Sequence, residues 1–252
     1  TCAFDPADLP RCENAPEEAC LTNEQLEAIQ TVYSPTIVEG EEVYPGWPLG
    51  GEVVGWPMWI TKLEGGTDLP PGFPPNAHYA FGTGVFRNFI YSDSQWTYVG
   101  YEFDDWEERS APVAALLNAT DSDLSEFRDR GGRLIIWHGW SDAALSALDS
   151  VDYYEDVAAR DAAVGEYARM FLLPGVAHCG GGPGPDQVDW ITAIEQWVEQ
   201  DIAPERLIAA KRDDSGNATM LRPVCAYPAT AVYDGQGDPN LAESFVCTTV
   251  QE

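Results

Sequence analysis

The chain has 252 residues, of which 44% are hydrophobic and 22% are charged. This length permits a substantial buried core, and the composition excludes disorder over the whole chain. Against 42 Asp and Glu residues there are only 13 Lys and Arg residues, which gives a net charge of −29. Nucleic acids and anionic lipids are bound through clustered Lys and Arg, so we expect neither nucleic acid nor membrane as a partner. No apolar run approaches the roughly 18 residues of a membrane-spanning helix.

The first part of the chain is interrupted throughout by Pro and Gly, as in the stretch 44–51, YPGWPLGG. Such residues break helices and central strands. Only one helix is predicted in this part, over 22–33, with Thr22 as its N-cap and apolar residues at helical spacing behind it. We therefore expect the first part of the chain, up to about residue 110, to form a loop-rich cap and not an autonomous regular domain.

From about residue 120 the pattern changes to alternating helices and strands. Five elements are predicted, in the order helix, strand, helix, strand, helix: 121–130 with Asp121 as N-cap, 133–138, 150–159, 167–173 and 188–199. Both strands are short apolar runs, as buried parallel strands are. This alternation is typical of an α/β fold with a parallel sheet. Two strands are too few for a sheet covered on both faces, so we expect residues 121–252 to form the end of a sheet that begins elsewhere.

Polar side chains follow both predicted strands. Asp142 comes soon after the first strand, and His178 soon after the second. In open α/β sheets functional groups gather beyond the carboxyl ends of the strands. An acid and then a histidine in these places match the second and third members of the Ser…Asp…His triad of α/β-hydrolases. Taken separately they fit a turn aspartate and a loop histidine; taken together, in this order, they predict a triad pair.

The nucleophile of such a triad is missing from the sequence. A Gly-x-Ser-x-Gly elbow is expected between a strand and a helix well before the aspartate, and no serine of this chain has those neighbours. Ser141 directly precedes Asp142, which is the wrong side in the triad order. His138 ends the first strand and is expected to be a packing residue, while His78 lies in a Pro-rich loop and has no predicted role.

Several strings of residues resemble a known family. They are 135–142 (IIWHGWSD), 151–155 (VDYYE), 173–185 (LPGVAHCGGGPGP), 222–228 (RPVCAYP) and 245–247 (FVC). Together they resemble the tannase and feruloyl esterase family of serine hydrolases, which includes mono(2-hydroxyethyl) terephthalate hydrolase. The resemblance covers most of the chain. It implies the C-terminal part of an α/β-hydrolase fold over 121–252, preceded by part of the lid over 1–120.

The resemblance also implies an activity and the residues that carry it. By it the chain is the carboxyl-terminal half of a carboxylic ester hydrolase, in which Asp142 is the triad acid and His178 the triad base. The missing N-terminal half would supply the serine and would also bind calcium, so no metal or other cofactor is assigned to this chain. The alternative is a non-catalytic subunit or degenerate paralogue that binds aromatic esters without cleaving them.

Six cysteines are present, none of them in a CxxC pair, and three histidines cannot complete a zinc-finger pattern. An even number of cysteines here favours disulfides in an oxidising compartment, so we expect a secreted or periplasmic protein. The family resemblance implies the pairing: Cys12 with Cys20, Cys225 with Cys247, and both Cys2 and Cys179 with upstream cysteines. Two cysteines left over imply partners on another chain, so the N-terminal half is expected to be disulfide-linked to this one. A longer sequence of which this is only a part would explain the two cysteines equally well.

The expected substrate is a small ester of a flat aromatic acid, of galloyl, feruloyl (hydroxycinnamoyl) or terephthaloyl type. Aromatic lid residues suit such an acyl group, and Trp59 and Phe86 are candidates to bind it; the alternative is a place in the lid core. Arg87 is a candidate to meet a substrate carboxylate or phenol, and a salt bridge is the alternative. Leu145 is a candidate for the border of the acyl pocket, with core packing as the alternative.

Overall fold

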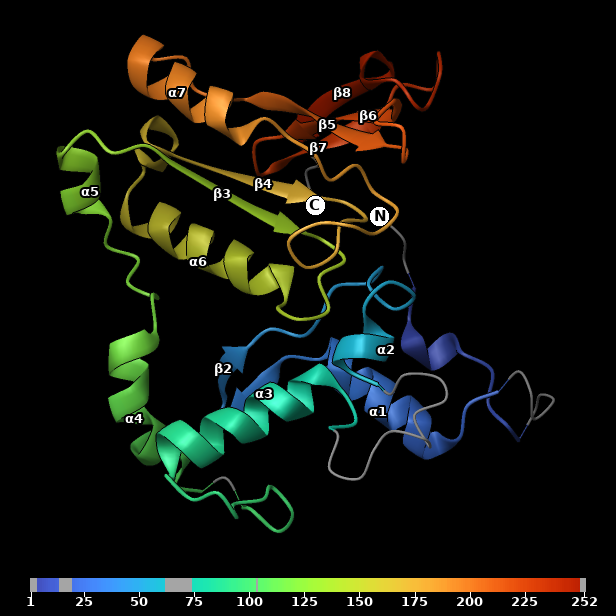
Figure 1. Ribbon diagram of the computed structural model, residues 1–252, viewed down its shortest axis with the longest axis vertical. Coiled ribbons are helices and arrows are strands. Elements are labelled where there is room, and N and C mark those ends of the chain that lie inside the picture. The colour runs from blue at the N-terminus through green and yellow to red at the C-terminus, as the bar shows by residue number, and fades with distance from the viewer. Residues whose placement is uncertain (1–3, 14–19, 62–73, 103, 250–252) are drawn as a thin grey trace.

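The structure is a computed structural model that describes residues 4–13, 20–61, 74–102 and 104–249. We refer to residues 4–117 as the N-terminal region and to residues 118–249 as the C-terminal region. Figure 1 shows the helices of the N-terminal region at one end of the molecule and the strands of the C-terminal region at the other. None of the described helices has the length and apolar character needed to span a membrane.

The N-terminal region is mainly helical. Its elements are η1 (Pro6–Asp8), α1 (Asn23–Tyr33), β1 (Thr36–Val38), β2 (Glu41–Tyr44), α2 (Trp56–Trp59), α3 (Ala77–Val85), the π-helical turn η3 (Phe86–Ile90) and α4 (Trp106–Leu117). The predicted helix over 22–33 is confirmed as α1. Thr22 Oγ1 accepts from the Gln25 N–H and the Gln25 side chain accepts from the Thr22 N–H, so a capping box begins the helix.

The prediction that α1 is the only helix of this region is wrong, because α3 and α4 are also helical. The Asn76 side chain accepts from the Tyr79 N–H and so starts α3 directly after two prolines. Pro112 lies inside α4 without ending it. Pro and Gly residues in this region therefore lie next to or within helices as well as in loops.

The strands of the C-terminal region form three two-stranded sheets. The elements of this region are α5 (Ser125–Asp129), β3 (Leu134–Gly139), α6 (Ala147–Arg160), η4 (Val164–Glu166), β4 (Ala168–Leu173), α7 (Trp190–Gln200), β5 (Arg206–Arg212), β6 (Ala218–Cys225), β7 (Ala229–Tyr233), η5 (Ala242–Ser244) and β8 (Phe245–Thr249). The sheets are β3–β4, β5–β6 and β7–β8. Both predicted strands are confirmed, and β3 and β4 pair in parallel from Leu134 with Ala168 to Gly139 with Leu173. The α/β fold class is thereby shown, and the predicted helices over 150–159 and 188–199 correspond to α6 and α7.

Two helix starts of this region differ from the predictions by three residues or more. The helix predicted from Asp121 begins only at Ser125, because Asp121 and Asp123 each accept from the backbone N–H two residues further on and form turns instead. Helix α6 begins one turn early, at Ala147, because the Ser146 hydroxyl accepts from the Leu148 N–H and caps it. The hairpins β5–β6 and β7–β8 had not been predicted at all.

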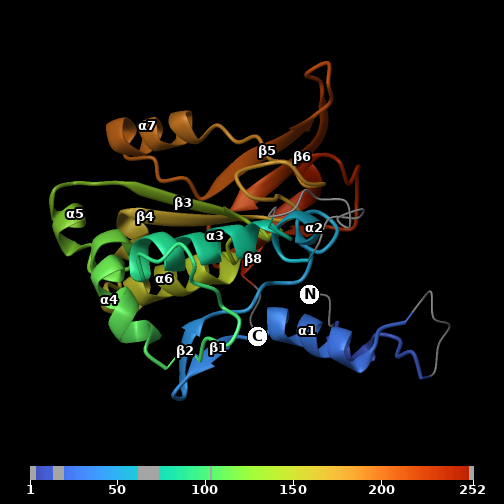
Figure 2. The same ribbon diagram turned by 60° about the horizontal axis from the view of Figure 1, so that its bottom comes forward.

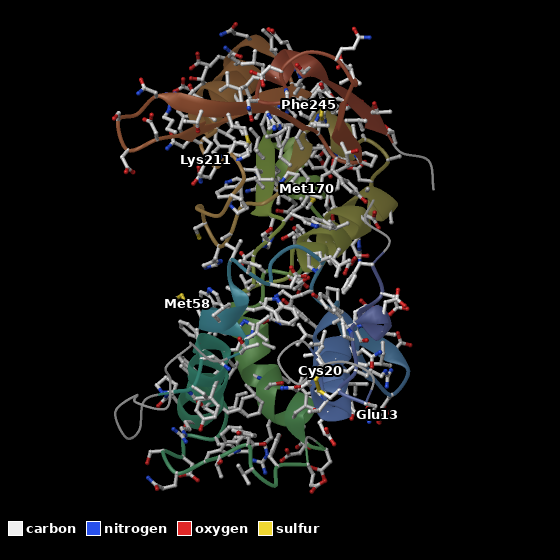
Figure 3. The ribbon with its side chains drawn as sticks, turned by 90° about the vertical axis from the view of Figure 1, so that its right-hand side faces the viewer. Glu13, Cys20, Met58, Met170, Lys211 and Phe245 are labelled. Carbon is white, nitrogen blue, oxygen red and sulfur yellow. A yellow bond between two sulfur atoms is a disulfide. The ribbon has the colours of Figure 1, made fainter. Side chains whose placement is uncertain are left out.

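The core lies on both faces of β4, as expected for a central strand. Ala168 and Met170 face α6 in one cluster, while Phe171 and Leu173 face β5 and β6 in another. An isolated bridge between Phe171 and Ala226 attaches the antiparallel hairpins to the parallel pair. Figure 3 shows Met170 inside this region, below the strand layer that carries Lys211 and Phe245.

Two predicted disulfides are present. Cys225–Cys247 joins β6 to β8, and Cys12–Cys20 closes a short loop ahead of α1. Cys2 lies outside the described residues. Cys179 is an exposed free thiol among the described cysteines, so neither of the predicted links to an upstream cysteine is tested by the structure.

The two regions meet where the segment 45–56 packs on the turn after β3. The hydroxyl of Ser141 donates to the Gly50 carbonyl at 2.8 Å, and the hydroxyl of Ser146 donates to the Gly46 carbonyl at 2.7 Å. A Cβ atom on Gly55 would lie 2.6 Å from Cβ of Ala143, so the approach requires glycine. Figure 2 shows this connection as the loop that runs from the β1–β2 hairpin up to α2.

Candidate active site

The candidate site lies at the carboxyl ends of β3 and β4. After β3 the chain turns sharply. The Trp140 N–H donates to the carbonyl of Leu173, the last residue of β4, and the Ser141 N–H donates to the carbonyl of Val176, which follows that strand. A Cβ atom on Gly139 would lie 2.4 Å from the Val176 carbonyl oxygen. Glycine at this position therefore lets the two strand ends come close enough to bring their loops together.

These loops place Asp142 and His178 in direct contact. Asp142 Oδ2 accepts from His178 Nδ1 at 2.8 Å, and Asp142 Oδ1 accepts from the N–H groups of Ala144 at 2.7 Å and Leu145 at 3.1 Å. The Asp142 side chain is only 4% exposed. Burial opposes its ionisation, but the hydrogen bonds from His138, His178 and the two backbone groups outweigh it and lower the pKa of Asp142 to about 2.

The loop that carries His178 is held by contacts with Lys211 and Asp186. Lys211, on β5, donates to the Gly182 carbonyl at 2.8 Å and lies 3.5 Å from a carboxylate oxygen of Asp186. Asp186 in turn accepts from the Gly181 N–H at 2.8 Å. Burial opposes ionisation of Asp186, but the Gly181 N–H and the Lys211 ammonium lower its pKa. The run of glycines that follows His178 thus forms a loop with fixed contacts.

An aromatic surface lies against His178. The Trp59 ring meets the His178 ring edge-on, with centroids 5.3 Å apart, and stacks on Phe81 at 6.0 Å. His78 lies 5.9 Å from the same indole, and its Nε2 is 2.9 Å from the Ala144 carbonyl oxygen. Phe81 is 66% exposed and Leu145 is 55% exposed, so both side chains present apolar surface that the described residues do not cover.

The structure brings together only part of the predicted site. Trp59 lies beside His178, and Leu145 contacts Asp142 through its backbone. Phe86 and Arg87 are not brought to the pair: Phe86 stacks on Trp96 at 4.6 Å, and Arg87 Nε donates to the Trp96 carbonyl at 2.7 Å.

Sequence reasoning missed two histidines of this site. His138 was expected only to pack, yet its Nε2 lies 3.2 Å from Asp142 Oδ2 and its Nδ1 lies 2.8 Å from the Ser150 hydroxyl. Its place four residues before Asp142 was the available signal. His78 had no such signal, because 66 residues separate it from Ala144 and only the packing of the N-terminal region brings it near.

The serines nearest the pair use their hydroxyls elsewhere. Ser141 and Ser146 donate to carbonyls of the segment 45–56, and Ser150 contacts His138. Within the described residues no hydrogen bond is formed by His178 Nε2. The described His, Cys, Asp and Glu side chains also form no group of three that would hold a metal ion, and the calcium expected in the N-terminal half remains a prediction.

Comparisons with known proteins place the chain in a family. The family described as "Tannase and feruloyl esterase" matches residues 1–248. An uncharacterized esterase of Xanthomonas campestris is 33% identical over 98% of this chain and 49% of that protein. Mono(2-hydroxyethyl) terephthalate hydrolase of Piscinibacter sakaiensis is 47% identical over 51% of this chain and 22% of that protein.

A solved structure shows the same fold. The crystal structure of an esterase from Aspergillus oryzae matches with a TM-score of 0.83 and 26% identity, covering 98% of this chain and 50% of that one. The chain thus spans about half the length of the curated relatives it matches over most of its own length. With a family match that extends over nearly every residue, the chain belongs to the tannase and feruloyl esterase family.

Proposed function

We propose that this chain is part of a carboxylic ester hydrolase that cleaves esters of aromatic acids by a Ser-His-Asp triad. Asp142 and His178 serve as the triad acid and base, and the serine comes from an N-terminal half. The observation that carries the proposal is the 2.8 Å contact between Asp142 Oδ2 and His178 Nδ1 at the ends of two parallel strands. The esterase names of the relatives agree with this chemistry.

The geometry defines what each group does. Because the ionised Asp142 only accepts hydrogen bonds, His178 Nδ1 carries a proton, and its Nε2 lone pair is left to act as a base. Nε2 takes the serine proton while the serine oxygen bonds to the ester carbonyl carbon, and it then gives that proton to the departing alcohol. In the second half Nε2 takes a proton from water while the water oxygen attacks the acyl-serine, and it then returns that proton to the serine oxygen as the acid leaves. Asp142 stays ionised and stabilises the imidazolium throughout.

The aromatic surface supports the choice of acyl group. Trp59 lies beside His178 and stacks on the exposed ring of Phe81, and a flat aryl acid has the shape to pack on these two rings. A galloyl, feruloyl or terephthaloyl ester fits this description. Leu145 would border the same acyl group from the Asp142 side.

The free thiol supports the proposed partner. Cys179 is exposed and directly follows His178, so a disulfide from it to the N-terminal half would hold the base loop against the segment that bears the serine. Together with the two internal disulfides, this arrangement is suited to an oxidising compartment, and we propose a secreted or periplasmic location.

The test is hydrolysis of methyl gallate, methyl ferulate and mono(2-hydroxyethyl) terephthalate by the full-length protein. His178→Ala and Asp142→Asn are expected to lower kcat by at least about 1000-fold, as losses of a triad base or acid do. Asp156→Asn, which removes an exposed carboxylate on α6, is the matched control and should leave the rate unchanged. Retained hydrolysis in His178→Ala would overturn the proposal, and binding without turnover by the unsubstituted protein would favour the non-catalytic alternative.

A further inference from the structure

We propose that His138 is a positioning residue of this site, which holds the Asp142 carboxylate in place for His178 through a hydrogen-bond chain that begins at Ser150. The inference rests on the proposed function, since it concerns the same aspartate. His138 is the last but one residue of β3, and Ser150 lies in the first half of α6. The hydrogen bonds from Ser150 through His138 therefore link α6 and β3 to the Asp142–His178 pair.

Each carboxylate oxygen of Asp142 accepts two hydrogen bonds. Oδ1 accepts two backbone N–H groups, and Oδ2 accepts from His178 Nδ1 at 2.8 Å and from His138 Nε2 at 3.2 Å. An ionised carboxylate has no hydrogen to donate, so each histidine nitrogen that faces Oδ2 carries a proton. Two imidazoles thus share one oxygen of a carboxylate that is almost fully buried.

The two histidines must then be opposite tautomers when both are neutral. His178 is protonated on Nδ1, whereas His138 is protonated on Nε2 and has a lone pair on Nδ1. That lone pair lies 2.8 Å from the Ser150 oxygen, so the Ser150 hydroxyl donates to it. Ser150 therefore stabilises the one tautomer of His138 that can donate to Asp142.

Both ring nitrogens of His138 are engaged, which distinguishes it from a histidine that only fills space. Three further groups contact or influence the surroundings of the carboxylate: His78, which contacts the Ala144 carbonyl, Tyr44, whose hydroxyl accepts from the Ser146 N–H, and Asp149. Of the described titratable groups, only the two histidines bond to Asp142 directly through their side chains.

His138 also sets how strongly Asp142 binds the imidazolium. A hydrogen bond from Nε2–H draws negative charge on Oδ2 toward His138, so less of it acts on His178. Without His138, the Asp142 carboxylate would rotate more freely, and its Oδ2 would attract the His178 imidazolium more strongly. The base would then be less well aligned, and it would keep its proton to higher pH.

The decisive experiment compares His138→Leu, His138→Gln and Ser150→Ala in ester hydrolysis by the full-length protein. His138→Leu is expected to lower kcat about 10- to 100-fold, the size of one lost hydrogen bond to a charged group, with KM changed less than about threefold. The acid limb of its kcat/KM–pH profile should move to higher pH. His138→Gln retains an N–H donor and should recover most of the rate, and Ser150→Ala should lose about two- to fivefold.

A merely structural role predicts something different: equal losses in His138→Leu and His138→Gln, or an unmoved acid limb, would overturn the inference. If His138→Leu does not fold, the comparison of His138→Gln with Ser150→Ala still tests the inference. A large rate loss in His138→Gln together with no loss in Ser150→Ala would contradict the hydrogen-bond chain. Imidazole ¹⁵N shifts of the unsubstituted protein give a readout independent of activity. Protonation of His138 on Nδ1 would refute the inference alone, whereas absence of hydrolysis with the expected tautomers would refute only the proposed function.

Discussion

The two regions of the molecule are held together by different means. The C-terminal region has a core in which Met170 and Phe171 are fully buried on opposite faces of β4. In the described part of the N-terminal region, residues outside the segment 45–56 are almost all at least partly exposed, with Leu26 and Thr83 as the buried ones. Most of the buried residues of this region therefore lie in the segment that contacts the turn carrying Asp142. Its position depends on the C-terminal region, and the aromatic surface beside His178 depends on that position.

The largest expected effect is in the core of the C-terminal region. Met170→Ala removes a fully buried side chain and should lower the free energy of unfolding by about 2–5 kcal/mol, from lost burial and a residual cavity. Leu116→Ala, at an 82% exposed position of α4, is the control and should change it by less than about 0.5 kcal/mol. Denaturant unfolding measures both. Similar values for the two variants would contradict the contrast between the regions.

A smaller effect is expected at the contact between the regions. Ser146→Ala removes the hydroxyl that caps α6 and donates to the Gly46 carbonyl, and it should cost about 1–3 kcal/mol. Because the lost bond holds the N-terminal region, limited proteolysis of the segment 45–56 should also become faster. Ser215→Ala, in the exposed turn between β5 and β6, is the control for both measurements. Unchanged proteolysis would mean that the segment is held by other contacts.

The smallest effect is a pH dependence that belongs to Asp142. Its folded-state pKa of about 2 lies below the ordinary carboxyl value of 3.8, so its contribution to stability is present above pH 4. This contribution is lost as the pH falls from about 4 to about 2. The free energy of unfolding should therefore drop less steeply over this window in Asp142→Asn than in the unsubstituted protein. Equal slopes would show that the hydrogen bonds to Asp142 do not favour its ionised form.

The two regions also differ in how well the sequence predicts their secondary structure and their site residues. In the C-terminal region the apolar runs around 135 and 170 form the parallel strands β3 and β4, and Asp142 and His178 meet beyond their ends. These patterns are local, and burial on both faces leaves a strong signal. The hairpins β5–β6 and β7–β8 carry Arg206, Pro223 and many exposed residues, so that signal is absent.

In the N-terminal region the residues that matter are selected by long-range packing. Trp59 reaches His178 across 119 residues, while Phe86, of the same chemical type, turns to Trp96 instead. Composition does not distinguish these two rings, because both lie in a stretch rich in aromatic residues. For the contact between His138 and Asp142 the four-residue spacing was the only sequence signal, because the contact requires the turn after β3 to bring Asp142 back onto the strand end.

The central claim is that the Asp142–His178 pair activates a serine supplied by the rest of the protein. The most direct measurement is the intact mass of the full-length protein after reaction with an organophosphonate ester, a reagent that phosphonylates an activated serine. We predict one adduct per protein, on a serine outside this chain, with loss of ester hydrolysis, and no adduct in His178→Ala. Equal labelling of His178→Ala would contradict the account. So would a protein that hydrolyses esters but forms no adduct with the reagent.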